Sequence, residues 1–107
     1  MSAKKPMHPG KFIMGAYIEP LALTASDVAD SLGVHRATFS RLLNGKIDVT
    51  PEMAMRLSDV FGGSPESWIN MQTSHTLARL RSSADWQKGK PTKRIKAIAQ
   101  QLPNAAA

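Results

Sequence analysis

The stretch that most constrains this chain is residues 34–46, which read VHRATFSRLLNGK. At about 100° per residue, Phe39, Leu42 and Leu43 fall on one side of a helix. The opposite side carries polar and small residues, namely Arg36, Ala37, Ser40, Arg41 and Asn44. Gly45 can adopt the positive φ that ends a helix. The stretch therefore predicts an amphipathic helix with one packed face and one face free to bind.

A shorter helix is predicted directly before this one, over residues 24–33. Thr24 is a suitable N-cap, and Asp27 lies three residues further on, in a weaker form of the capping box. An apolar stripe follows at helical spacing, formed by Val28, Ala29 and Leu32. Gly33 permits a sharp turn into the second helix. Two short helices joined by a glycine turn predict a helix-turn-helix.

The free face of the second helix suits double-stranded DNA. A recognition helix enters the major groove, where an arginine can make two parallel hydrogen bonds to guanine. Arg36 and Arg41 lie about one and a half turns apart, so both can reach into one groove. Ser40 and Asn44 lie between and beyond them, at positions suited to base or phosphate contacts. The alternative is a merely solvated polar face, which the paired helix and its turn make the weaker interpretation.

Composition limits the other functional classes. The chain has 107 residues, a formal charge of +6 and no cysteine, which predicts one domain without disulfides or thiolate metal sites. The three histidines, His8, His35 and His75, have no ligand spacing, so we expect no metal, no cofactor and no enzyme activity. No apolar run approaches a membrane span, and no signal peptide follows Met1, so we expect a cytoplasmic protein without a membrane partner. Domains this small often gain stability by dimerising.

The chain divides into three parts in our interpretation. Residues 1–9, with Lys4, Lys5, Pro6 and Pro9, predict a flexible N-terminal arm. Residues 10–81 predict the DNA-binding domain. Residues 82–107 form a basic tail that holds five Lys or Arg and one Asp, which is a net charge of +4. Within the tail, 85–91 reads as a linker and 92–102 as a short helix with Ile95, Ile98 and Leu102 on one face. A helix of that length is marginal in water, so we expect it either to be disordered or to fold against a partner or the body of a dimer. We expect the tail to contact the DNA backbone or to act in solubility.

Three more helices complete the predicted domain. The first runs over residues 10–19 and ends at Pro20, with a stripe of Phe12, Ile13, Ala16 and Tyr17. Leu21 and Leu23 are expected to enter the core after it. The sequences Thr50-Pro51-Glu52 and Ser64-Pro65-Glu66 are typical helix starts. The predicted buried stripe of the fourth helix is Met53, Ala54, Leu57, Val60 and Phe61. The fifth helix, which ends near Arg81, has the apolar residues Trp68, Ile69, Met71, Leu77 and Leu80, of which Trp68 is expected in the core.

Several spaced motifs together resemble a known family. They are His8-Pro9-Gly10, Glu19-Pro20-Leu21, the stretch 40–45, Thr50 to Leu57, and Ser64 to Gln72. This combination is similar to the HigA-type antitoxins, which belong to the xenobiotic-response-element group of lambda repressor-like helix-turn-helix proteins. The resemblance covers about residues 8–81. It implies an all-α, five-helix lambda repressor-like domain, followed here by the basic tail.

The resemblance also implies a function. It indicates an antitoxin that binds a ribosome-dependent messenger-RNA endonuclease toxin and represses the shared operon as a homodimer on operator DNA. Carried over by position, the base-reading residues are Arg36, Ala37 and Arg41, to which the helix geometry adds Ser40. The phosphate-contacting residues are His35, Thr38, Asn44 and Lys46.

Two departures from the family pattern affect this site. His35 stands where Ser or Thr is more usual, which weakens the cap of the recognition helix. Ala25 replaces a frequent phosphate-binding Gln. The toxin surface is left open between the outer faces of the first and fifth helices and the tail. The closest alternative function is a stand-alone transcriptional repressor without a toxin.

Overall fold

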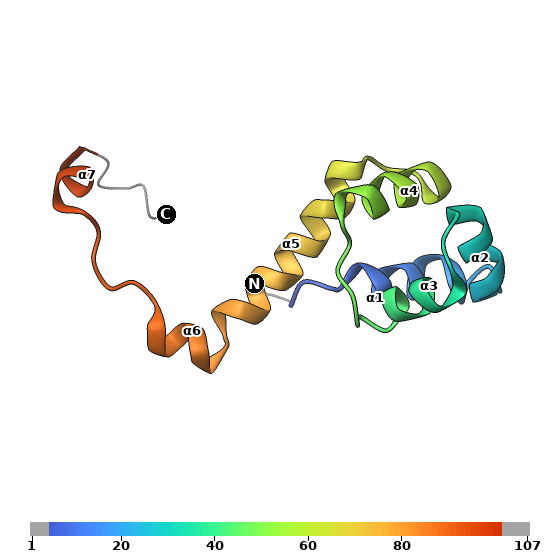
Figure 1. Cartoon of the computed structure of the whole chain (residues 1–107), viewed down its shortest axis with the longest axis horizontal. Coiled ribbons are helices and arrows are strands. Elements are labelled where there is room, and N and C mark those ends of the chain that lie inside the picture. Colours follow the sequence, from blue (N-terminus) through green and yellow to red (C-terminus); the bar gives the residue numbers. More distant parts are fainter. Residues whose placement is uncertain (1–4, 102–107) are drawn as a thin grey trace.

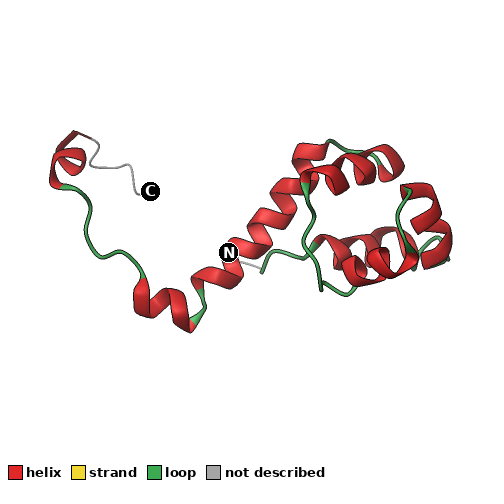
Figure 2. Cartoon of the chain, viewed as in Figure 1, coloured by secondary structure: helices red, strands yellow, loops and turns green. Residues whose placement is uncertain are grey.

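The computed structural model describes residues 5–101 and contains helices but no strand in that range (Figures 1 and 2). The elements are α1 (Pro9–Ile13), η1 (Met14–Ile18), α2 (Ala25–Leu32), α3 (Arg36–Leu43), α4 (Pro51–Phe61), α5 (Pro65–Arg81), α6 (Ala84–Gly89) and α7 (Lys96–Gln101). The predicted all-α class and helix-turn-helix are confirmed. The predictions for Lys4 and Leu102 lie outside the described residues.

Local capping determines where three of the helices begin. The side-chain oxygen of Thr24 accepts a hydrogen bond from the Asp27 amide at 3.1 Å, and Thr50 accepts one from Met53 at 3.2 Å. Ser64 and Ser67 form a complete capping box at the start of α5. Each cap satisfies an amide that would otherwise lack a partner inside the helix. The predicted starts of α2, α4 and α5 are therefore confirmed.

The core forms where the inner faces of the first five α-helices meet. Phe39 and Leu42 are fully buried, so α3 is held by its predicted apolar face. Trp68 is also buried, as predicted, and its indole N–H donates to the carbonyl of Gly62 at 3.0 Å. The buried apolar residues are Ile13, Val28, Ala29, Leu32, Phe39, Leu42, Val49, Met53, Ala54, Leu57 and Trp68.

The first predicted helix is not a regular α-helix. It begins at Pro9 rather than Gly10, and its second half is the π-helical turn η1, in which the Glu19 amide donates to the Met14 carbonyl at 3.0 Å. A π-turn adds a residue and shifts the phase of the helix surface. Ala16 is therefore exposed instead of buried, and Ile18 packs against the core in its place.

Two residues that we expected in the core lie at the surface instead. Leu21 is 62% exposed and Val60 is 36% exposed. Leu21 lies in the turn that follows η1 and its side chain stays at the surface, while Leu23 packs against the core as expected. Val60 lies in the last turn of α4, where the neighbouring Phe61 packs against the core and Val60 does not. Both side chains line one groove on the surface of the domain.

The C-terminal half of the chain also departs from the prediction. The apolar residues Leu77 and Leu80 are about half exposed, in the part of α5 that continues past the end of the domain (Figure 1). Residues 85–91, predicted as a linker, mostly form α6, which is capped by the Ser83 hydroxyl on the Trp86 amide at 3.2 Å. The helix predicted over 92–102 is shorter, since α7 starts at Lys96.

His8 fixes the start of α1. Its Nδ1 accepts a hydrogen bond from the Gly10 amide at 2.9 Å, and its Nε2–H donates to the carbonyl of Ile47 at 3.1 Å. This pattern requires the neutral imidazole with its proton on Nε2. His8 and Pro9, which we had placed in the N-terminal arm, are consequently buried against the domain.

We expect the stability of the domain to fall below about pH 6.5 because of His8. Burial lowers the pKa of His8 below its ordinary value of 6.5, and protonation of Nδ1 would break the bond from Gly10. The unfolded chain therefore binds a proton before the folded one, so stability is complete above pH 6.5 and is lost as the pH falls toward the lowered native pKa.

Urea unfolding at pH 8.0 and pH 5.5 measures this effect. The control is His8→Asn, which keeps an acceptor for the cap but does not titrate. The other two histidines are present in both proteins, so the difference between the two isolates the contribution of His8. If the natural protein and His8→Asn lost the same stability between pH 8.0 and pH 5.5, His8 would not be the cause of the pH dependence.

Candidate nucleic-acid interface

The turn between α2 and α3 has a defined geometry. Gly33 adopts φ +74°, and the amide of Val34 donates to the Ala29 carbonyl at 3.1 Å. A guanidinium N–H of Arg56 donates to the carbonyl of Leu32 at 2.9 Å, which attaches α4 to the turn. A Cβ atom at Gly33 would lie 2.9 Å from this guanidinium group, so both the backbone angle and the space favour glycine. The turn therefore holds α3 at a fixed angle to α2.

The exposed face of α3 carries the predicted base-reading residues. Arg36, Ala37 and Arg41 are exposed, and Ser40 is half-buried between them. They occupy one strip along the helix because Phe39 and Leu42 point into the core on the other side. Only one salt bridge occurs among residues 5–101, between Arg56 and Glu52. The two arginines of the strip are thus not neutralised by a salt bridge in this part of the chain.

The four predicted phosphate contacts surround this strip. His35 is the N-cap of α3 and makes no side-chain capping bond, as its departure from Ser or Thr predicted. Thr38 is half-buried at the side of the helix. Asn44 is exposed and donates one amide N–H to the Ser40 carbonyl at 3.0 Å. Lys46 follows Gly45, whose φ of +69° ends the helix.

Residues outside the predicted set hold or extend this surface. Gln72 is buried on α5, and its Oε1 accepts from the Val49 amide at 2.8 Å, while its Nε2 donates to Asp48 at 3.3 Å. Polarity alone suggested a surface residue, although Gln72 stands four residues after Trp68, on the buried side of the helix. Lys11 lies beside Asn44 in a shallow hollow and adds a cation at the edge of the strip.

The polar side chains of the α3 surface are hydrogen-bond donors and cations, which are suited to binding a polyanion. The surface offers guanidinium and ammonium donors on a protruding helix, which suit base edges in the major groove and the phosphates beside it. Within residues 5–101 no group of three or more His, Cys, Asp or Glu side chains is arranged to hold a metal ion. Nor does any helix in that range have the length and apolar character needed to cross a membrane.

Comparison with known proteins places this architecture among bacterial regulators. Residues 15–68 match the helix-turn-helix model HTH_3. An uncharacterised HTH-type transcriptional regulator of Haemophilus influenzae is 39% identical over 88 residues, which cover 82% of this chain and 82% of that protein. Antitoxin HigA-1 of Vibrio cholerae is 35% identical over 79 residues, which cover 74% of each chain.

A solved structure supports the same grouping. The structure of antitoxin GraA superposes with a TM-score of 0.78 at 27% identity and covers 87% of this chain and all of the other. The structural similarity extends beyond the helix-turn-helix of α2 and α3 to most of the chain.

Proposed function

We propose, because this chain belongs to the HTH_3 helix-turn-helix family and is related to HigA antitoxins, that it is an autoregulatory antitoxin. Its DNA-binding part represses the operon that encodes it, and another surface neutralises a ribosome-dependent messenger-RNA endonuclease toxin. The observation that carries the DNA part is the exposed strip of α3, with Arg36 and Arg41 on a helix held by buried Phe39.

We assign roles within this interface residue by residue. Arg36, Ala37, Ser40 and Arg41 read base edges, because they form the outermost strip of α3. The phosphates beside the groove are contacted by His35, Thr38, Asn44 and Lys46. The position of Lys11 beside Asn44 adds it to the second group. Phosphate contacts give the register, and base contacts give the sequence preference.

We further propose that the chain acts as a homodimer on an inverted repeat. One recognition helix covers only a few base pairs, so specificity requires two half-sites about one DNA turn, ~34 Å, apart. The last turns of α5 and the following α6 expose three large apolar side chains, Leu77, Leu80 and Trp86. Large apolar side chains exposed this close together in the sequence favour an interface with a second copy.

Growth of cells that express the neighbouring reading frame tests the antitoxin part. We expect the neighbour to arrest growth and this protein to restore it. The double variant Arg36→Ala/Arg41→Ala should restore growth equally, because it changes only the DNA-reading strip. If rescue of growth depended on the two arginines, the DNA-reading strip and the toxin-neutralising surface would not be separate.

The alternative function is a stand-alone repressor. The related Haemophilus influenzae protein, an uncharacterised transcriptional regulator, favours it. In that case the neighbouring reading frame is harmless when expressed alone, and the protein still binds the DNA upstream of its own gene. The growth experiment therefore separates the two functions.

A further inference from the structure

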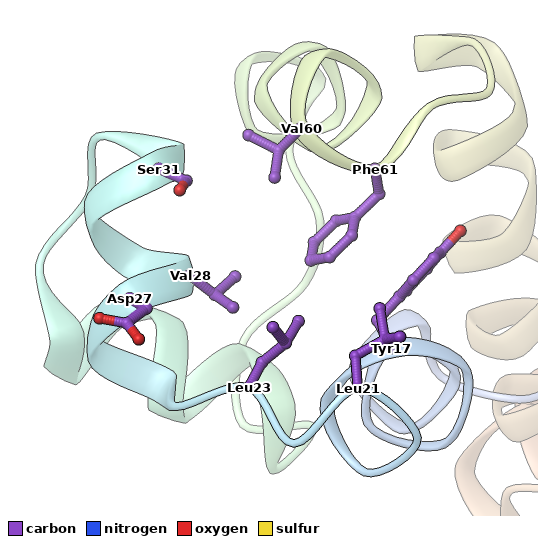
Figure 3. A pocket seen from close by; sticks show the side chains of 8 residues that line it. All are labelled: Tyr17, Leu21, Leu23, Asp27, Val28, Ser31, Val60 and Phe61. Atoms are coloured by element: carbon purple, nitrogen blue, oxygen red, sulfur yellow. The ribbon is translucent and has the colours of Figure 1, made fainter.

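The domain has a second surface that is separate from the strip of α3. It is a groove of about 350 Å³ between α2, α4 and the segment that joins η1 to α2 (Figure 3). Leu21 and Val60 stand at its opening, and both are substantially exposed. The groove is lined by Tyr17, Leu21, Leu23, Asp27, Val28, Ser31, Val60 and Phe61. Most of these side chains are apolar, which is typical of a surface that binds a partner.

The elements around the groove are acidic, in a chain that is basic overall. Residues 12–35 contain Glu19, Asp27 and Asp30 but no Lys or Arg, a net charge of −3 in a chain of +6. On α4, Asp59 precedes Val60. The one cation of α4, Arg56, is bound to the Glu52 carboxylate and the Leu32 carbonyl. The groove thus suits a segment with apolar side chains flanked by cations.

The tail of this chain has the matching chemistry. Ile95 is 68% exposed and Ile98 is 45% exposed, and their spacing of three places them on one side of a helix. Lys93 precedes both isoleucines, and Lys96 lies between them in the sequence. No residue of α7 is buried, and a helix of six residues is not stable in water without a partner. The basic tail and the acidic groove are therefore complementary in both apolar surface and charge.

We propose that residues 92–101 of each chain dock in the groove of the second copy in the homodimer. Ile95 and Ile98 enter the apolar lining, and Lys93 and Lys96 lie near the carboxylates of α2 and α4. Docking between chains is favoured over docking within one chain because α5 separates the two elements. It spans about 25 Å from its first to its last residue, and Figure 1 shows α6 and α7 leading away from α2. The inference rests on the homodimer proposed above.

Disulfide cross-linking of the full chain tests this arrangement directly, because the natural sequence has no cysteine. The double variant Val60→Cys/Ile98→Cys places one thiol at the groove and one on the tail. Under mild oxidation we expect covalent dimers to form at least tenfold faster than in the control Met55→Cys/Ile98→Cys. Met55 is 59% exposed and lies outside the groove, against 36% for Val60, so the thiol of the control is more accessible than the one that it is compared with.

Charge reversal gives a second readout on the same variant. Asp27→Lys should slow the cross-linking severalfold, and adding Lys93→Glu/Lys96→Glu should restore much of the rate. Higher salt should slow the reaction of the parent variant, since charges at the surface are screened. Insensitivity to both changes would overturn the charge part of the proposal.

Each contrary outcome has its own meaning. A rate equal to that of the control overturns the docking, and an intrachain disulfide shows that the tail returns to its own domain. Sedimentation of the reduced variants measures the dimer independently. A monomer would overturn both the homodimer and the docking, whereas a dimer with an undocked tail would overturn only the docking.

If the tail lies on DNA instead, deleting residues 92–107 flattens the salt dependence of DNA binding while cross-linking stays at the control level. If a toxin fills the groove, Val60→Asp abolishes growth rescue without any specific cross-link.

Discussion

The variant Gly10→Ala is expected to lower the stability of the domain by about 3 kcal/mol or more, although Gly10 lies in a helix where alanine is normally favourable. In α1 this glycine packs directly on the backbone of α3. A Cβ atom there would overlap the Leu42 carbonyl oxygen and lie 2.9 Å from Cα of Leu43. Because these contacts are with backbone atoms, no side chain can move aside, and α3 must shift.

Thermal unfolding monitored by circular dichroism measures the effect, with Gly15→Ala as the control. A Cβ atom at Gly15 would meet no atom within 4 Å apart from its chain neighbours and the backbone of its own helix. The control should therefore gain about 0.5–1 kcal/mol from helix propensity alone. For Gly10→Ala we expect the Tm to fall by roughly 15 °C, at about 4–8 °C per kcal/mol in a domain of this size. Similar Tm values for the two variants would mean that α1 and α3 are not in close contact.

The second large effect is expected in DNA binding. Arg36→Ala/Arg41→Ala should cost about 1–3 kcal/mol of specific binding for each arginine, which together is at least a thirtyfold loss of affinity for the operator. The reason is that both guanidinium groups lie exposed on the outer strip of α3, where a base edge would be. Binding to unrelated duplex DNA should weaken much less.

The charge-preserving variant Arg36→Lys/Arg41→Lys separates reading from simple attraction. Lysine keeps the charge but cannot form the two parallel hydrogen bonds of arginine. We expect it to keep most of the nonspecific affinity and to lose specificity. Fluorescence anisotropy with operator and unrelated duplexes at two salt concentrations measures the specific and the nonspecific affinity. A ratio of specific to nonspecific affinity equal to that of the natural protein would show that α3 does not read bases.

Features that depend only on residues close together in the sequence, such as helix starts and helix faces, could be predicted from it. The caps at Thr24, Thr50 and Ser64 act within three residues, so their positions could be read directly. The two faces of α3 follow from helix periodicity for the same reason. The fold class and the outward direction of the reading strip were therefore predictable from residues alone.

Features that depend on contacts between distant segments could not be read in this way. The π-turn at residues 14–18 breaks the 3.6-residue period, so the exposure of Ala16 was wrongly predicted. Leu21 lies in the turn beyond it, where no periodicity indicates which side chain faces the core. Gln72 looks like a surface residue until the loop 48–49 provides its hydrogen-bond partners. Leu77 and Leu80 have an apolar pattern, but nothing in the sequence shows that α5 extends beyond the domain.

The attachment of the loop after α3 to α5 has a consequence for the geometry of the operator. Gln72 binds Val49, and the ring of His75 lies against that of His8, which binds Ile47. The same helix carries the apolar residues proposed to join two copies. In the homodimer proposed above, α5 therefore connects the two copies of α3. The dimer then selects the distance between the two half-sites as well as their sequence. Five extra base pairs, about half a DNA turn, would place the second half-site on the side of the duplex that the dimer cannot reach.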